Sequence, residues 1–192
     1  MIRNTNFCTN ICMIITDQNS EQAFSYAPDL RPGFVAHMAN RLDALICAQT
    51  KEILEAAEVK TPVHSVSVML HLLRQGPASI ADIARSQERS HQLIVSRVAP
   101  LEKSGLVKME TDPEDERRKI LSFTRAGAID ARKAERVSLK IAASFTDLHE
   151  ELGVDLMALL ERAEQLLRQK PLAVRNAAPA KRVRRKASTR AA

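Results

Sequence analysis

The chain has 192 residues, of which 45% are apolar but only 3% are aromatic, and it contains no tryptophan. This length suits one domain with extensions, and the composition predicts a mainly α-helical core of Leu, Ile, Val, Ala and Met. No run of about 18 apolar residues is present. The N-terminal segment NICMII is too short for a secretory signal, so we predict a cytoplasmic protein without a membrane segment.

The net charge of +6 is concentrated at the C-terminal end. Residues 171–192 contain seven Lys and Arg and no acid, and removing these charges leaves residues 1–170 with a net charge of −1. The Ala-, Pro- and Arg-rich composition lacks the apolar periodicity of a folded segment, which predicts a disordered basic tail. Such a tail can be an electrostatic arm for nucleic acid or a solubilising end, and the sequence leaves both open.

Enzyme chemistry has no support in the sequence. There is no nucleophile elbow, no Gly-rich phosphate loop and no metal-ligand spacing, so we predict no catalytic residue, no metal site and no cofactor. The three cysteines, Cys8, Cys12 and Cys47, do not indicate a disulfide framework. Cys47 falls in an apolar helical pattern and is expected to be buried. Cys8 and Cys12 are one turn apart if helical, which leaves a redox-sensing pair open.

An N-terminal extension and two helices are predicted before residue 79. Residues 1–28 are largely polar and predict a partly helical N-terminal extension, with Met13 as an alternative start. After Pro32, apolar residues recur at helical spacing over about five turns. The pair Thr61-Pro62 predicts the start of another helix, with the Thr61 hydroxyl as its cap, and Gly76 ends that helix.

Residues 79–105 predict two short helices joined by a tight turn. Ser79, with Asp82 three residues on, resembles a capping box with the shorter acid. Ser90 can cap the second helix, and Gly105 provides the left-handed residue that ends it. Because the second helix is longer and polar on its outer face, the pair indicates a helix-turn-helix.

A β-hairpin and two helices follow. Residues 106–110 and 119–124 are predicted strands, and the charged stretch DPEDER forms the tip between them. Thr124 caps a long helix that ends at Gly153, and a last amphipathic helix follows it. A helix-turn-helix that leads directly into a hairpin is a winged helix. The predicted fold is therefore mainly α, with a winged helix-turn-helix, a two-stranded wing and flanking helices.

The tip of the wing carries the charges. An arginine at such a tip can enter a DNA minor groove, where negative potential is concentrated. Asp115 lies two residues before Arg117 and can orient its guanidinium through charge-assisted hydrogen bonds. Arg118 is a further candidate, although strand alternation can turn it to the other face. A solvated charged turn is the alternative for this stretch taken alone.

The order of these elements, with the segments LEKSGLV, DPEDER and FTRAG, resembles the MarR family of bacterial transcription regulators over residues 33–170. The resemblance implies a triangular homodimer whose two winged lobes bind successive major grooves of a pseudo-palindromic operator. The flanking helices carry more apolar surface than one lobe can cover, which agrees with a dimer interface. The predicted parts are an extension at 1–28, a MarR-like domain at 29–170 with the winged helix at 61–124 and dimerisation helices at 33–58 and 125–170, and the tail at 171–192.

The same resemblance implies which residues meet double-stranded DNA. The recognition helix would present Ser90, His91, Gln92, Val95 and Ser96 to the major groove. Gln92 can bond adenine, Ser90 or Ser96 can take a phosphate or a base edge, and His91 can equally reach a phosphate. Arg117 would be the minor-groove residue of the wing, with Asp115 as its orienter. Arg97 stands at an often apolar inward position and must extend to a phosphate or to solvent.

The predicted function is a dimeric, sequence-specific DNA-binding repressor, or an activator, that a small effector releases from its operator. The resemblance implies small aromatic or anionic effectors between the dimerisation helices and the winged lobe. Candidate residues there are His37, Arg41, His64 and His71, each of which is also open to a structural or surface role. The rival is a non-specific architectural DNA-binding protein that uses the basic tail and the wing.

Overall fold

The structure, a computed structural model, describes residues 27–112, 115 and 117–177. Most of the predicted N-terminal extension, with Cys8, Cys12 and Met13, and residues 178–192 of the predicted tail lie outside these residues. The chain divides into two compact units, Met1–Ile141 and Ala142–Ala192. None of the described helices has the length and apolar character needed to cross a bilayer.

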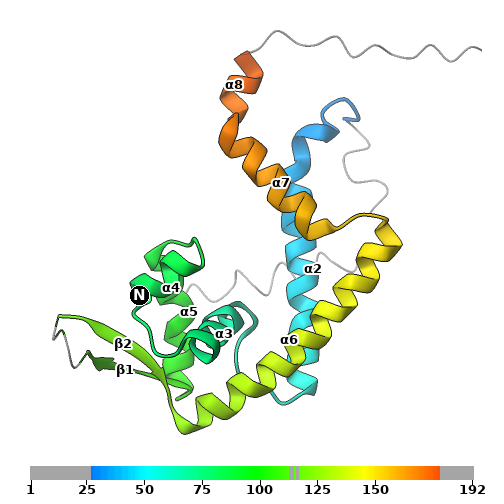
Figure 1. The fold of residues 1–192 in the computed structure, drawn as a ribbon. Coiled ribbons are helices and arrows are strands. Elements are labelled where there is room, and N and C mark those ends of the chain that lie inside the picture. The colour runs from blue at the N-terminus through cyan, green and yellow to red at the C-terminus, as the bar shows by residue number, and fades with distance from the viewer. Residues whose placement is uncertain (1–26, 113–114, 116, 178–192) are drawn as a thin grey trace, which may run out of the picture. The chain divides into compact units, whose positions relative to one another are not determined.

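The first unit contains a lobe of short helices that carries a β-hairpin, with a longer helix on either side of it in the sequence (Figure 1). The predicted order of elements is confirmed from residue 31 to residue 169. The elements are η2 Arg31–Phe34, α2 Val35–Ala56, η3 Val63–Ser65, α3 Val66–Gln75, α4 Ile80–Ser86, α5 His91–Lys103, β1 Val107–Thr111, β2 Lys119–Phe123 and α6 Arg125–Leu152, the last of which continues into the second unit.

The prediction that Thr61 caps the helix after it is wrong. Pro62 occupies the N-cap of η3, and no side chain caps that turn. The buried Thr61 hydroxyl instead donates to the carboxylate of Asp130 on α6 at 2.6 Å. The same carboxylate accepts the backbone N–H groups of Lys60 and Thr61 at 2.9 and 3.0 Å. These bonds attach α6 to the start of the helical lobe, and each buried donor left unsatisfied would cost roughly 1–3 kcal/mol.

The caps predicted for the two short helices are confirmed. The Ser79 hydroxyl accepts the Asp82 N–H at 3.2 Å, and the Asp82 carboxylate accepts the Ser79 N–H, which makes a reciprocal capping box on α4. The Ser90 hydroxyl accepts the Leu93 N–H at 3.2 Å at the start of α5. Gly105 has φ +65° just after α5 ends, where residues with a side chain are strained.

The wing is an antiparallel hairpin that is hydrogen-bonded to the entry of α4. In its register Val107 lies opposite Phe123 and Met109 lies opposite Leu121. Ala78 extends the sheet by one bridge, because Ala78 and Leu121 exchange two backbone hydrogen bonds at 2.9 and 3.2 Å. The base of the wing is thus held to the residue before the α4 cap, which fixes the hairpin relative to the helix-turn-helix.

One apolar cluster unites the helix-turn-helix, the wing and the first turns of α6. Its buried residues come from every element between α3 and α6: Val68, Met69, Leu72, Ile83, Ala84, Ile94, Val98, Leu101, Leu106, Val107, Leu121 and Ala131. A second, smaller cluster joins the end of α2 to α6 through Leu54, Val59, Ala134 and Val137. The core is aliphatic, as the composition predicted.

The junction between the wing and α6 requires a glycine. The Thr124 hydroxyl accepts the Gly127 N–H at 3.0 Å and so caps α6, as predicted. A Cβ on Gly127 would lie 1.7 Å from the backbone oxygen of Leu106, a distance that no side chain permits. The first turn of α6 therefore packs directly on the backbone that enters β1, which explains the glycine of the FTRAG segment.

The second unit contains the end of α6, α7 Leu156–Gln169 and α8 Leu172–Ala177. Asp155 caps α7 by accepting the Ala158 N–H at 3.0 Å. The helix α8 corrects the expectation that the chain has no regular structure from residue 171 onward. Arg175 of α8 donates to the carbonyl oxygens of Lys170 and Leu166, each at 2.8 Å, so its guanidinium satisfies acceptors at the end of α7.

Candidate nucleic-acid interface

The predicted recognition helix, α5, has a buried face and an outer face at helical spacing. Ile94, Val98 and Leu101 are fully buried in the core of the lobe. The five residues predicted to meet the major groove are all exposed: Ser90, His91, Gln92, Val95 and Ser96. The structure therefore brings them together on the face that packing leaves open. A helix with a polar outer face of this width can enter a major groove.

Two of these side chains are held by local hydrogen bonds. The Ser90 oxygen accepts the Leu93 N–H, which leaves the hydroxyl proton available as a donor. The Ser96 hydroxyl donates to the Leu93 carbonyl at 2.7 Å, so its proton is already used. Ser90 can thus donate to a phosphate while it caps the helix, whereas Ser96 presents an acceptor.

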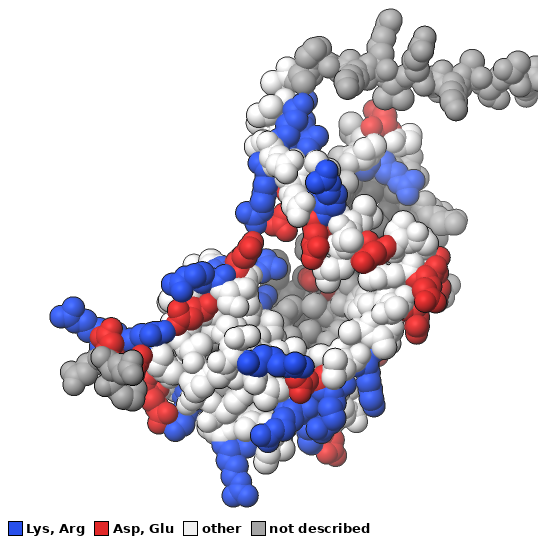
Figure 2. Space-filling view, in the orientation of Figure 1, with Lys and Arg blue, Asp and Glu red and all other residues white. Residues whose placement is uncertain are grey.

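The tip of the wing is a tight turn closed by Asp115. Its carboxylate accepts the backbone N–H of Arg117 at 3.0 Å, and its carbonyl accepts the N–H of Arg118 at 2.9 Å. Asp115 was expected to orient the Arg117 guanidinium; the contact in the structure is with the Arg117 backbone. Arg117 itself is exposed at the outer part of the wing, where Figure 2 shows basic side chains beside acidic ones.

Arg118 points back to the helix-turn-helix instead of outward. Its guanidinium forms an ion pair with Asp82 of the α4 capping box and lies 3.5 Å from a carboxylate oxygen of Asp112 at the end of the first wing strand. Ser79 donates its hydroxyl to the same Asp82 carboxylate at 2.6 Å. Arg118, predicted as a DNA contact, thus has its partners within the protein, where it links the wing to the start of α4.

This environment changes the acidity of Asp82. The Ser79 hydroxyl and then the Arg118 guanidinium stabilise the charged carboxylate, and together they lower the pKa of Asp82 from 3.8 to about 2. On the strand, the Lys108 ammonium donates to Glu110 at 2.7 Å and lowers the pKa of Glu110. Both acids therefore remain charged at neutral pH.

Arg97 also has a partner inside the lobe. It lies half-buried on α5, and its Nη1 donates to the hydroxyl oxygen of Ser67 on α3 at 3.2 Å. Its Nε is buried and has no hydrogen-bond partner in the part of the chain that the structure describes. Arg97 was predicted as a DNA contact that extends to a phosphate or to solvent, and the structure directs its guanidinium to α3.

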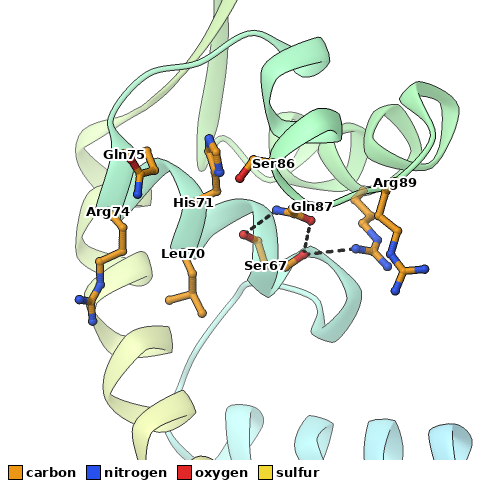
Figure 3. A pocket seen from close by; sticks show the side chains of 9 residues that line it. Ser67, Leu70, His71, Arg74, Gln75, Ser86, Gln87 and Arg89 are labelled. Atoms are coloured by element: carbon orange, nitrogen blue, oxygen red, sulfur yellow. Dashed lines mark hydrogen bonds between the residues drawn. The ribbon is translucent and has the colours of Figure 1, made fainter. Parts of the chain in front are cut away.

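A pocket of about 510 Å³ lies between α3 and the turn that joins α4 to α5 (Figure 3). It is lined by Ser67, Leu70, His71, Arg74, Gln75, Ser86, Gln87, Arg89 and Arg97. Of the four predicted effector residues, His71 lines this pocket. His37 and His64 are exposed on α2 and η3, and Arg41 is half-buried on α2.

The sequence patterns did not predict the Arg118–Asp82 pair or most of this pocket. The pair joins residues 36 positions apart, and the local pattern indicated a helix cap for Asp82 and an exposed wing position for Arg118. Cys47 was expected to be buried, but it is half-buried and its thiol donates to Asp43 at 3.9 Å. No group of three His, Cys, Asp or Glu suited to a metal ion occurs among the described residues.

Comparisons with known proteins agree with this architecture. Residues 61–118, which contain the helix-turn-helix and most of the wing, match the sequence model of the MarR family. No curated protein sequence matches the chain significantly.

Solved structures share the fold at low sequence identity. Reduced AbfR bound to DNA has a TM-score of 0.55 and 22% identity over 72% of this chain and 93% of that chain. BpsR of Bordetella bronchiseptica has a TM-score of 0.53 and 20% identity over 68% of this chain and 92% of that one. The transcriptional regulator PA4135 has a TM-score of 0.51 and 19% identity over 71% of this chain and 98% of its own.

The lowered pKa of Asp82 predicts a pH-dependent difference between the native protein and Asp82→Asn. Because the pKa of Asp82 falls from 3.8 to about 2 on folding, its ionised carboxylate stabilises the folded protein at pH values above 3.8. This stabilisation is lost as the pH falls from 3.8 towards about 2. Urea unfolding should show Asp82→Asn to be the less stable protein at about pH 5, with a smaller difference at about pH 2.5. Asp147→Asn, which removes an exposed carboxylate of α6, is the control. A difference that stays constant over this range would contradict the role of Asp82.

Proposed function

Since this chain belongs to the MarR family of winged helix-turn-helix, DNA-binding transcription regulators, we propose that it is a homodimeric, sequence-specific regulator, acting as a repressor. The observation that carries the proposal is the exposed polar face of α5 beside a wing that is fastened to the same lobe. A helix and an arginine can enter adjacent major and minor grooves at the same time only if the protein fixes the spacing between them.

In this proposal the exposed residues of α5 make the base and phosphate contacts. Gln92 has the two-sided amide that can bond adenine in the major groove, while Ser90 and His91, at the start of the helix, are placed for phosphates. Arg117 enters the minor groove from the wing, and Asp115 holds the backbone from which it extends. Arg118 and Arg97 position the wing and α5 through their contacts with Asp82 and Ser67.

Dimerisation is supported by apolar side chains that the single chain leaves uncovered. Val35, Met38, Leu42, Leu45 and Ile53 of α2 are exposed, and α7, which has no buried residue, exposes Met157, Leu159, Leu160, Leu166 and Leu167. Amphipathic helices that expose this much apolar surface normally bury it against a partner. We propose a second copy of this chain as that partner. The dimer would double the DNA contact and favour a pseudo-palindromic site.

Regulation by a small effector is part of the proposal. The DNA binding of BpsR is regulated by 6-hydroxynicotinic acid. An effector changes DNA affinity here if it binds one arrangement of the lobes better than another. The candidate residues from the sequence, His37, Arg41, His64 and His71, remain proposals, and of these His71 lines the pocket beside the helix-turn-helix.

Competition with random DNA separates the proposed function from the architectural alternative. A duplex enriched by the protein from a random library should resist random-sequence competitor by about a thousandfold or more, because base contacts add to backbone attraction. Removal of residues 171–192 should weaken this binding without abolishing it. Equal competition by random DNA, with loss of all binding on removal of the tail, would favour the architectural protein. Competition binding is measured by fluorescence anisotropy.

Arg117→Ala should weaken DNA binding and reduce its dependence on salt. Loss of one cationic contact lowers the slope of log K against log salt by about one, hence by about two for a dimer with two wings. The affinity for the enriched duplex should fall about tenfold to a hundredfold, which gel-shift titrations at several salt concentrations can measure. Arg132→Ala, an exposed arginine on α6, is the matched control. An unchanged slope would remove the wing tip from the interface.

Leu160→Glu should dissociate the dimer, because an unpaired carboxylate would be buried against the partner chain. Leu160 is 50% exposed in the single chain, so the substitution leaves the fold of one copy unaffected. Sedimentation equilibrium should show the dissociation constant to rise about a hundredfold or more. Gln165→Glu adds the same charge at an exposed polar position of α7 and should have little effect. A native protein that is monomeric while it saturates the enriched duplex would overturn the dimer.

A further inference from the structure

Val95 is the one large apolar side chain that the described residues of the winged lobe leave exposed. It is 41% exposed, whereas every other Leu, Ile, Val, Met and Phe that the structure describes between residues 61 and 124 is buried or half-buried. Val95 lies on α5, three residues after Gln92 and one before Ser96, which are exposed as well. A single exposed apolar residue is ordinary on a protein surface. This one, however, lies on the face proposed to meet the major groove.

Packing of the lobe does not require an apolar side chain at this position. Ile94 and Val98 make the inward contacts of α5 and are fully buried, while Val95 belongs to neither of the two apolar clusters. A β-branched residue is also a weaker helix former than alanine at an exposed helical position. The fold would therefore accept a small or polar residue here, and the valine needs another explanation.

The same face lacks the side chains that usually read guanine. The commonest specific contact to guanine is a bidentate arginine or lysine, and the segment from His91 to Ser96 contains neither. Arg97, the next residue, directs its guanidinium to the hydroxyl of Ser67 on α3. The exposed side chains that remain are an imidazole, an amide, a hydroxyl and one aliphatic group. An amide suits adenine and an aliphatic group suits the methyl of thymine, so this set favours A·T pairs.

Gln92 and Val95 are close enough on the helix surface to read neighbouring bases. Side chains three residues apart on a helix have Cβ atoms about 5–6 Å from each other. Successive bases of one strand are about 3.4 Å apart along the DNA axis. The two side chains therefore reach the same base pair or pairs that are one or two steps apart.

We propose that Val95 packs against the C5-methyl group of a thymine and so determines part of the operator sequence. This thymine belongs to the pair that Gln92 reads or lies within about two pairs of it, which centres each half-site on A·T pairs. The inference rests on the proposed function, because it requires α5 to enter the major groove. It adds the class of sequence that is bound and a residue that selects it.

Deoxyuridine differs from thymidine only in lacking the methyl group, so it tests this contact alone. Each thymine of the enriched duplex is replaced in turn, at the equivalent position of both half-sites, and the affinity is measured by fluorescence anisotropy. Replacement at one position should weaken binding of the native protein about fourfold for each half-site, hence about fifteenfold in total, because one buried methyl group is lost at each.

Val95→Ala connects this effect to the residue. The ratio of affinities for the thymine and uracil duplexes should fall from about fifteen to about one, because the contacting methyl groups are removed. The salt dependence should stay that of the native protein, since no charge is lost. Val95→Thr keeps one of the two methyl groups, should retain an intermediate ratio, and decides the result if Val95→Ala binds too weakly. Ile129→Ala, which shortens an exposed aliphatic side chain of α6, is the matched control and should keep the native ratio.

Failure of this inference is distinguishable from failure of the proposed function. If no thymine replacement weakens binding, or if Val95→Ala keeps the native ratio, Val95 does not read a methyl group. An enriched half-site with G·C pairs at its centre would overturn the inference as well. Each of these results leaves a sequence-specific regulator in place. Failure of the native protein to bind any duplex would instead reject the proposed function, and this inference with it.

Discussion

The contact between Arg118 and Asp82 joins the wing to the helix-turn-helix. Asp82 is at once the acid of the α4 capping box and the partner of the wing, so one carboxylate caps a helix and fastens a hairpin. The backbone bridge between Ala78 and Leu121 supports the same junction from the core side. The exposed face of α5 and the wing thereby belong to one lobe, and Arg117 directly precedes the arginine that makes this contact.

The apolar core makes this junction possible because it brings the participating segments close together. Leu106, Leu101 and Leu121 are buried in one cluster, so the end of α5, the entry of the wing and its return strand share the same packing. Gly127 lets α6 approach the backbone of Leu106, and Asp130, one turn later, accepts hydrogen bonds from the segment before α3. The long helix is therefore attached to the lobe on two sides, and a displacement of α6 would be transmitted to it.

The arginines of the wing and of α5 differ in where their guanidinium groups point. Arg118 and Arg97 are directed into the lobe, where each has an oxygen partner, while Arg117 remains exposed at the wing. Neighbouring arginines in the sequence thus differ in role because of the partners that the fold supplies. Arg89 and Arg97 also line the pocket next to α5, and Arg97 connects that helix to Ser67 of α3.

The order of the elements could be predicted from the residues alone, because apolar spacing, the Ser79, Ser90 and Thr124 caps and Gly105 act locally. The polar outer face of α5 could be predicted as well, since the helical repeat gives the outward positions once the inward residues are known. The hydrogen bond of Thr61 to Asp130 and the ion pair of Arg118 with Asp82 could be found only in the folded chain. Folding also brings His71, and none of the other three candidates, to the pocket. These contacts join residues far apart in the chain. A charged or hydroxyl side chain takes the partner that packing brings within reach, and no local pattern in the sequence records which partner that is.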